Sequence, residues 1–140
     1  MSNSQIPTDK VDAYLGTRYD VMVDDHTIHL TIGEPSVDMA EYFQRQGVAS
    51  AALITAFNPF GAVQADDANA AANQKLEQAV REDGLKFLPA SGSGEGWPAE
   101  PGFWVLGIEL DRARSLGKAF SQDAIVWMDL EAIPRLILLR

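Results

Sequence analysis

The sequence predicts a single-domain α/β sandwich with a mixed, mainly parallel sheet and helices packed on its faces. The chain has 140 residues, of which 46% are hydrophobic, enough for one core and too few residues for a second domain. Apolar segments of strand length alternate with segments of helical period. A strand, a helix and a strand in that order favour a parallel pair joined by a right-handed crossover. We expect one domain over residues 8–140 after a disordered tail at residues 1–7.

The segment from residue 51 to residue 80 is the centre of the predicted fold. Its apolar beginning, residues 51–54, predicts a buried strand. Asn58-Pro59 must end this strand and turn the chain, because proline has no N–H and disfavours helix in the residue before it. A helix from about Asp66 to Asp83 follows, and we expect it to cross over to a strand at Leu85–Ala90.

The remaining elements come from capping residues, turn residues and hydrophobic period. The segment Ser91–Gly102 holds four glycines and two prolines and predicts an irregular loop. Strand Phe103–Glu109 should run antiparallel to the strand before that loop. The other predicted elements are a helix at Thr8–Gly16, a hairpin of Tyr19–Val23 and Thr27–Ile32, helices at Ser36–Gln46 and Asp111–Phe120, and strands at Ala124–Leu130 and Arg135–Leu139.

Composition excludes several classes of function. With 20 acidic and 11 basic residues the net charge is −9, which repels a phosphate backbone, so we expect no nucleic-acid partner. No apolar run approaches the roughly 20 residues that span a bilayer, and no signal peptide begins the chain, so we expect a cytoplasmic protein without a membrane partner. Cysteine is absent, which excludes thiol chemistry. His26 and His29 would point to opposite faces of a strand, so we predict no metal site, and no motif calls for a cofactor.

Three asparagines are the first candidates for a site. Asn69 and Asn73 share one helical face with Leu76 and Val80, which should pack on the sheet, so both amides should point inward near Asn58. An amide both donates and accepts, so three of them in a cleft can recognise a polar ligand. The alternative is that they pair with the bent backbone around Pro59. The sequence leaves both interpretations open.

Further polar candidates come from the loop at residues 91–102 and from the turn before residue 124. Glu95 and Glu100 flank Trp97, and two carboxylates beside an aromatic ring suit acid–base chemistry or a ring-shaped ligand, whereas solvated carboxylates are the simpler interpretation. Trp97 either packs on the core or closes over a ligand as a lid. Gln122 and Asp123 either cap the last helix or reach the same edge of the sheet as the loop at residues 91–102.

Together these motifs resemble an uncharacterised bacterial family, the domain of unknown function catalogued as thirty-two ninety-three. The resemblance runs from about Tyr14 to Trp127 and implies no activity. Three positions depart from the family pattern, with Gly102 where Ser is usual, Ser121 where Gly is usual and Asp123 where Asn is usual. The motifs that carry the resemblance are Ile54-Thr-Ala-Phe-Asn-Pro59, Asn69 with Asn73-Gln-x-Leu76, Trp97-Pro-x-Glu-Pro101, Leu106-Gly-Ile108 and Phe120-Ser-Gln-Asp-Ala124.

These observations predict recognition of a small polar metabolite in a cleft at one sheet edge, and leave open whether a reaction follows. The alternative is a protein-interaction module that uses the acidic surface and the final strand as an open edge, through which we also expect a homodimer. A hydrolase using Glu95 or Glu100 is the third interpretation. The predicted ligand-contacting residues are Thr55, Asn58, Asn69, Asn73, Glu95, Trp97, Glu100, Gln122 and Asp123.

Overall fold

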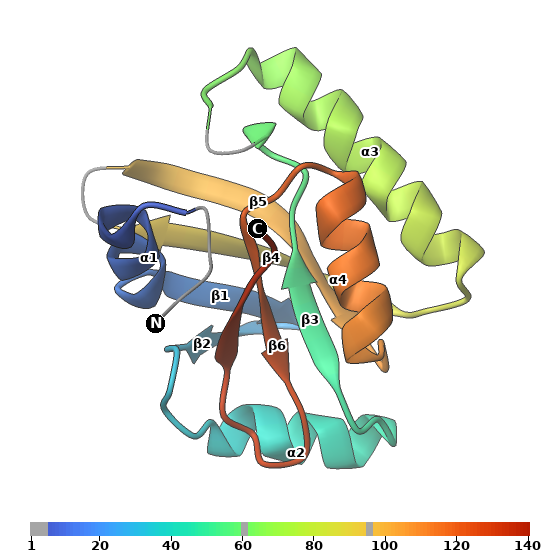
Figure 1. Ribbon diagram of the computed structural model, residues 1–140. Coiled ribbons are helices and arrows are strands. Elements are labelled where there is room, and N and C mark those ends of the chain that lie inside the picture. The colour runs from blue at the N-terminus through green and yellow to red at the C-terminus, as the bar shows by residue number, and fades with distance from the viewer. Residues whose placement is uncertain (1–5, 60–61, 95–96) are drawn as a thin grey trace.

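The computed structural model describes residues 6–59, 62–94 and 97–140 (Figure 1). Residues 1–5 of the predicted tail lie outside this part, and Ile6 is buried. In chain order the elements are α1 (Thr8–Leu15), β1 (Arg18–Val23), β2 (His26–Leu30), α2 (Val37–Gln46), β3 (Ala51–Ile54), α3 (Asp66–Glu82), β4 (Phe87–Gly94), β5 (Trp97–Leu106), α4 (Leu110–Ala119), β6 (Ala124–Met128) and β7 (Arg135–Leu138).

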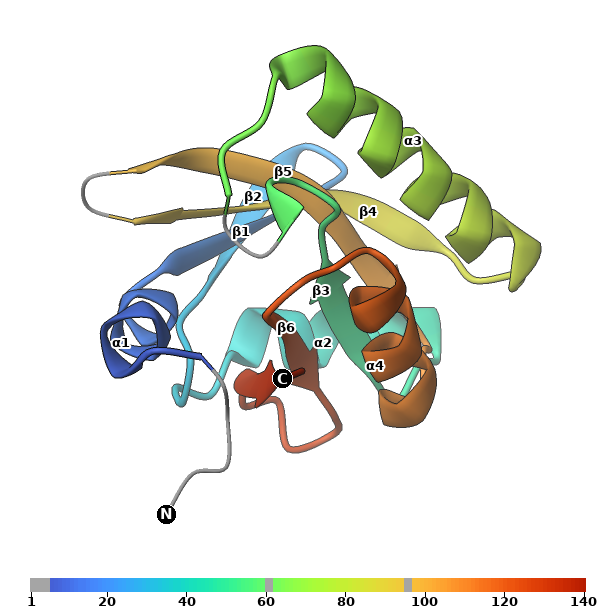
Figure 2. The ribbon, with the colours of Figure 1, turned by 45° about the horizontal axis from the view of Figure 1, so that its top comes forward.

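Within the described ranges, the strands form one sheet of seven in the order β2-β1-β4-β5-β3-β6-β7, and every neighbouring pair is antiparallel. The sheet curls around α2 as a half-barrel (Figures 1 and 2). The prediction of a mixed, mainly parallel sheet is therefore wrong, although the antiparallel pairing of β4 with β5 is confirmed.

The error lies in which strands are neighbours. Each of the helices α2, α3 and α4 joins two strands that run in the same sense, as expected of a crossover, but at least one antiparallel strand lies between them. The strand β5 separates β3 from β4, β3 separates β5 from β6, and three strands separate β2 from β3. The crossover rule needs the joined strands to be adjacent. The apolar run of β3 indicated burial on both faces, which a central antiparallel strand covered by helices also provides.

Two hydrophobic clusters cover the two faces of the sheet. On the concave face, Met39, Tyr42 and Phe43 of α2 pack on the inward side chains of the strands. On the other face, α3 and α4 pack over the centre of the sheet, with Leu76 and Ala113 among the buried contacts. Along β3 the side chains alternate between the clusters, with Ala51 and Leu53 in the first and Ala52 and Ile54 in the second.

Local signals placed several element boundaries correctly. Ser36 caps α2 by accepting a hydrogen bond from Met39 N at 3.2 Å, and Gly47 ends the helix in the left-handed conformation at φ 68°. Asp24 turns the β1–β2 hairpin at φ 50°. Thr8, a residue type that often caps a helix, lies inside α1 and not at its N-cap position, because Pro7 occupies that position and makes no side-chain cap.

The predicted loop over residues 91–102 is also wrong, because most of this segment belongs to the β4–β5 hairpin. Glycine within a strand often marks a close approach of another chain segment. A Cβ on Gly102 would lie 2.6 Å from Ile54 O and 2.9 Å from Thr55 Cβ, and one on Gly92 would lie 3.1 Å from the Tyr19 ring. These glycines therefore allow dense packing of strands and do not indicate a loop.

The strand β7 lies at one edge of the sheet and pairs on one side with β6. Its three apolar side chains, residues 136–138, are half-buried. A homodimer formed through this edge stays a prediction. In the part of the chain that the structure describes, no helix combines the length and the apolar character needed to cross a membrane.

Replacing Gly102 by alanine tests the close approach of β5 to the end of β3. We expect Gly102→Ala to lower the free energy of unfolding by about 1–3 kcal/mol, because the added methyl group meets backbone that cannot move aside easily. Gly16→Ala is the control, since its Cβ would lie 3.5 Å from the nearest atom and its φ of −87° suits any residue. Urea unfolding of both variants gives the comparison, and equal stabilities would contradict the packing described here.

Candidate ligand-binding site

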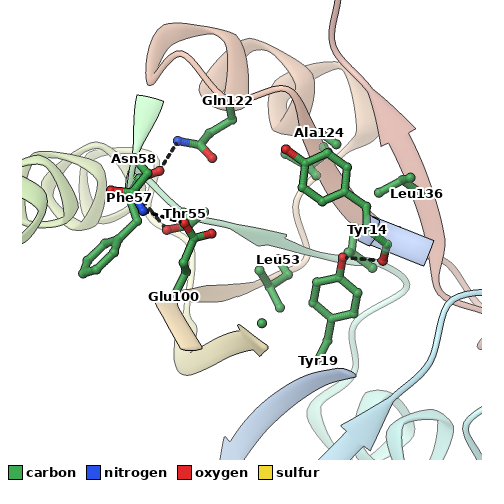
Figure 3. A pocket seen from close by; sticks show the side chains of 13 residues that line it. Tyr14, Tyr19, Leu53, Thr55, Phe57, Asn58, Glu100, Gln122, Ala124 and Leu136 are labelled. Carbon is green, nitrogen blue, oxygen red and sulfur yellow. Dashed lines mark hydrogen bonds between the residues drawn. The ribbon is translucent and has the colours of Figure 1, made fainter. Parts of the chain in front are cut away.

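Two hollows meet at Asn58 and Glu100, where the β3–α3 loop faces β5. The inner one is a cavity of about 60 Å³ on the concave face of the sheet, next to Leu53 and Val126. The outer one is a cleft of about 460 Å³ that the start of α3 and α1 also line. Figure 3 shows the inner cavity, with Tyr14 and Tyr19 on one side and Asn58, Glu100 and Gln122 on the other.

The side chain of Asn73 fixes the beginning of the loop. Its Oδ1 accepts a hydrogen bond from Ala56 N at 2.9 Å, and its Nδ2 donates to Pro101 O at 3.0 Å. Thr55 strengthens the same junction, because its Oγ1 donates to Pro101 O at 2.7 Å and accepts from Phe57 N at 3.1 Å. The helix α3, the loop and β5 are thereby joined at one point.

Asn58 and Asn69 hold the next part of the loop. Asn69 Oδ1 accepts from Asn58 N at 2.9 Å, and Asn69 Nδ2 donates to Asn58 Oδ1 at 3.0 Å. Gln64 binds both asparagines, with its Nε2 donating to Asn69 Oδ1 at 2.7 Å and its backbone N donating to Asn58 Oδ1 at 3.2 Å. Asn58 has φ 45°, a left-handed conformation that asparagine tolerates better than most residues. The paired amides explain how the chain turns here.

Glu100 stands between the two hollows and is half-buried. Its Oε1 accepts a hydrogen bond from Asn58 Nδ2 at 2.9 Å. Burial raises the pKa of this carboxyl group above its ordinary value, although the hydrogen bond from Asn58 and the charge of Lys10 act in the opposite direction. The ionised form of Glu100 is therefore disfavoured where it stands.

The helix α1 closes the inner cavity although it contains no buried residue. Tyr14 reaches from it over the cavity, and Tyr19 OH of β1 donates to Tyr14 O at 3.0 Å (Figure 3). Burial raises the pKa of Tyr19 to about 12 and raises that of Tyr14 further, with the nearby Asp123 adding to the effect at Tyr14. Both phenols are therefore neutral at physiological pH and serve as hydrogen-bonding groups.

Asp123 ties α1 and the C-terminal segment to the sheet. Its side chain is fully buried and forms salt bridges with Lys10 and Arg140, and Tyr14 OH donates to its Oδ2 at 3.3 Å. Burial would raise the pKa of this carboxyl group, but the hydrogen bonds from Lys10 and Arg140 outweigh burial and hold the pKa below its ordinary value. Two cations thus support aspartate at a position where the resemblance expects asparagine.

The structure brings most of the predicted residues to one region but gives them different tasks. Thr55, Asn58, Glu100 and Gln122 line the inner cavity, and Asn58, Glu100 and Asn69 line the cleft. Gln122 also holds the loop, with its Nε2 donating to Phe57 O at 3.1 Å. Asn73 and Asp123 lie outside both hollows and act through the contacts above. Glu95 lies outside the described residues, and of Trp97 only the backbone, in β5, is described.

The residues that surround these polar groups were not predicted from the sequence. Tyr14 and Tyr19 line the inner cavity and Lys10 lines the cleft, and none of the three was a predicted site residue. Val63 also lines the cleft and has 90% of its surface exposed. The one feature of the sequence that could have indicated this apolar wall was a valine between a predicted turn and a predicted helix. Among the described residues, no group of three or more His, Asp or Glu is placed to hold a metal ion.

Comparison with known proteins gives one match. A family model described as "Protein of unknown function (DUF3293)" matches residues 54–125, more than half of the chain, and confirms the resemblance. This region carries the loop, α3, the β4–β5 hairpin and α4, whereas α1 and β1 lie outside it. No curated protein and no solved structure matches the chain.

Truncating Asn73 tests the junction of α3, the loop and β5. We expect Asn73→Ala to lower the free energy of unfolding by about 1–3 kcal/mol, because the buried Ala56 N loses its partner and Pro101 O keeps the hydrogen bond from Thr55 but loses the one from α3. Gln74→Ala, at the next and exposed position of α3, is the matched control. Urea unfolding that finds both variants as stable as the parent would show that the amide does not hold the loop.

Replacing Asp123 by asparagine tests the buried ion cluster. At pH 7 we expect Asp123→Asn to lower the free energy of unfolding by about 1–3 kcal/mol, since Lys10 and Arg140 lose a charged partner but remain partly exposed to water. The folded-state pKa of Asp123 is lowered, so its stabilisation is present above the unfolded pKa of about 3.9 and disappears as the pH falls through the folded value. The stability difference between parent and variant should therefore shrink on acidification below pH 4, and a pH-independent difference would contradict the assignment.

Proposed function

The chain belongs to the DUF3293 family, whose description assigns no activity, and we propose that it binds a small polar metabolite in the cleft beside the Asn58 loop. The cleft lies between α1, the loop after β3, the first turn of α3 and the Ala99–Glu100 part of β5. Its volume of about 460 Å³ is within the range of roughly 300–1,000 Å³ typical of small-molecule sites. The inner cavity of about 60 Å³ suits water rather than a metabolite.

The half-buried carboxylate of Glu100 is the observation that carries this proposal. Burial disfavours its charge, and the hydrogen bond from the neutral amide of Asn58 and the charge of Lys10 offset this effect only in part. Ionisable groups in such unfavourable surroundings concentrate at functional sites, where stability is given up for binding or chemistry. Asp123, by contrast, has two cationic partners and fits a structural role.

The asparagines support the site by positioning Glu100 and the loop. Asn58 Oδ1 accepts from both Asn69 Nδ2 and Gln64 N, so its Nδ2 is directed to Glu100. A ligand therefore meets a loop already fixed in shape, which lowers the entropy lost on binding. The proposed ligand contacts are the carboxylate of Glu100, the side chain of Asn58 and the apolar side chains that line the cleft.

The lid role of Trp97 and the hydrolase interpretation stay predictions of the sequence. A lid at Trp97 would close the cleft from the hairpin that carries Glu100, since both residues belong to β5. Acid–base hydrolysis by a pair of carboxylates needs a second group beside Glu100, and Glu95 lies outside the described residues. Binding without assigned chemistry is accordingly the function that we propose.

Replacing Glu100 by glutamine separates the binding role of this residue from a structural role. The folded-state pKa of Glu100 is raised above the unfolded value of about 4.3. Its favourable contribution to the free energy of unfolding is therefore present below that value and is lost as the pH rises through the folded pKa. At pH 7 we expect Glu100→Gln to raise the melting temperature in calorimetry, and at pH 4 the gain should vanish. A thermal-shift screen against a metabolite library should then find compounds that stabilise the parent and lose their effect in the variant.

Glu82→Gln is the matched control, because Glu82 is exposed near the end of α3 and lines neither hollow. It should change neither the pH dependence nor the ligand response. A Glu100→Gln variant that is less stable than the parent at pH 7, and that responds to the same compounds equally, would make Glu100 a structural residue and refute the proposed site.

A further inference from the structure

We infer that the cleft binds a small organic cation, an amine or a guanidine attached to an apolar or aromatic body, with its charged nitrogen against the carboxylate of Glu100. The inference rests on the proposed function and specifies the class of ligand. It combines three features of the cleft, which are its charge balance, the first turn of α3, which shares Asp66 with that balance, and its apolar lining.

The charged side chains that line the cleft favour a positive ligand. Among the residues that the structure describes, they are Lys10, Asp66 and Glu100. Lys10 forms a salt bridge with the fully buried Asp123, which a second cation, Arg140, also binds. The amide of Asn58 donates a hydrogen bond to Glu100 but brings no charge. The charge of Lys10 offsets the burial of Glu100 only in part, and a cationic ligand would add to it and favour the ionised form of this half-buried group.

The first turn of α3 excludes the opposite class of ligand. A helix N-terminus attracts anions because its N–H groups and its dipole point outward. Here Asp66 and Asp67 occupy that turn, and Asp67 Oδ1 accepts a hydrogen bond from Ala68 N at 2.8 Å. The two carboxylates offset the dipole and repel a phosphate or carboxylate that approaches the cleft. The net charge of −9 acts in the same direction over the whole surface.

The remaining lining suits the body of such a ligand. Phe57, Tyr14 and Val63 give the cleft an apolar wall, and the Phe57 ring points away from the two tyrosines of the inner cavity (Figure 3). Val63 exposes 90% of its surface in the absence of a ligand, so covering it would contribute favourably to binding. Aromatic faces also attract cations, which adds to the preference set by Glu100.

Three probes that share one ring and differ in charge test the inference: benzylammonium, benzyl alcohol and benzoate. We would titrate each into the unchanged chain at pH 7 and follow backbone amide shifts by NMR. Benzylammonium should shift residues around Glu100 and Val63 and should bind at least about tenfold more tightly than the other two, the scale of one charged hydrogen bond. Glu100→Gln should remove this preference, and Glu82→Gln should keep it.

Benzyl alcohol or benzoate binding the cleft as tightly as benzylammonium would overturn the cation inference and would leave small-molecule binding in place. Benzylammonium shifts that lie away from the cleft, or that persist in Glu100→Gln, would overturn it as well. The comparison among the three probes needs no variant, so it decides the question even where Glu100→Gln folds poorly. Failure of the proposed function is a separate result, in which no library compound acts through the cleft.

Discussion

The amide of Asn73 is the contact on which the site depends. It lies on α3 and bonds to the backbone of the β3–α3 loop on one side and of β5 on the other, so three elements distant in sequence meet at one side chain. The same junction brings β5 so close to the end of β3 that a Cβ on residue 102 would lie 2.6 Å from Ile54 O. The junction at Asn73 thus bears on the shape of the β3–α3 loop, on the packing of β5 against β3 and on the position of Glu100 in β5. The inward asparagines thus have a backbone-pairing role, and their effect on a ligand is indirect.

Two carboxylates in the same region, Asp123 and Glu100, have different surroundings, and this difference distinguishes a structural role from a binding role. Asp123 is the more deeply buried, yet Lys10 and Arg140 compensate its charge and lower its pKa. Glu100 is less buried, but the neutral amide of Asn58 and the charge of Lys10 only partly offset its burial, which still raises its pKa. Removing the partners of a buried charge destabilises the fold, whereas a charge that its surroundings compensate only in part is a candidate for a functional site. The assignment of Glu100 to the site depends on this contrast.

The helix α1 owes its place to polar contacts rather than to a hydrophobic face. It has no buried residue, and its links to the domain run through Lys10 and Tyr14 to Asp123 and through Tyr19 to its last turn. It nevertheless lines both hollows. Because the family model covers residues 54–125, the wall that α1 contributes lies outside the matched region, while Asn58 and Glu100 lie within it.

The sequence by itself determined the helices, most strands and the inward direction of two asparagines. Hydrophobic period placed α2 and α3, with Ser36 and Gly47 at the ends of α2, and the spacing of Asn69, Asn73, Leu76 and Val80 correctly predicted one buried face. Only the tertiary structure decided the strand order and the partners of each polar group. Burial on both faces looks the same in parallel and antiparallel central strands, so β3 could not reveal its neighbours. The sequence likewise does not distinguish a glycine in a loop from a glycine at a close contact. The role of Glu100 could not be predicted either, because it depends on the contact with Asn58, which is 42 residues away in sequence. Such long-range pairings arise from packing the whole chain, and no local pattern encodes them.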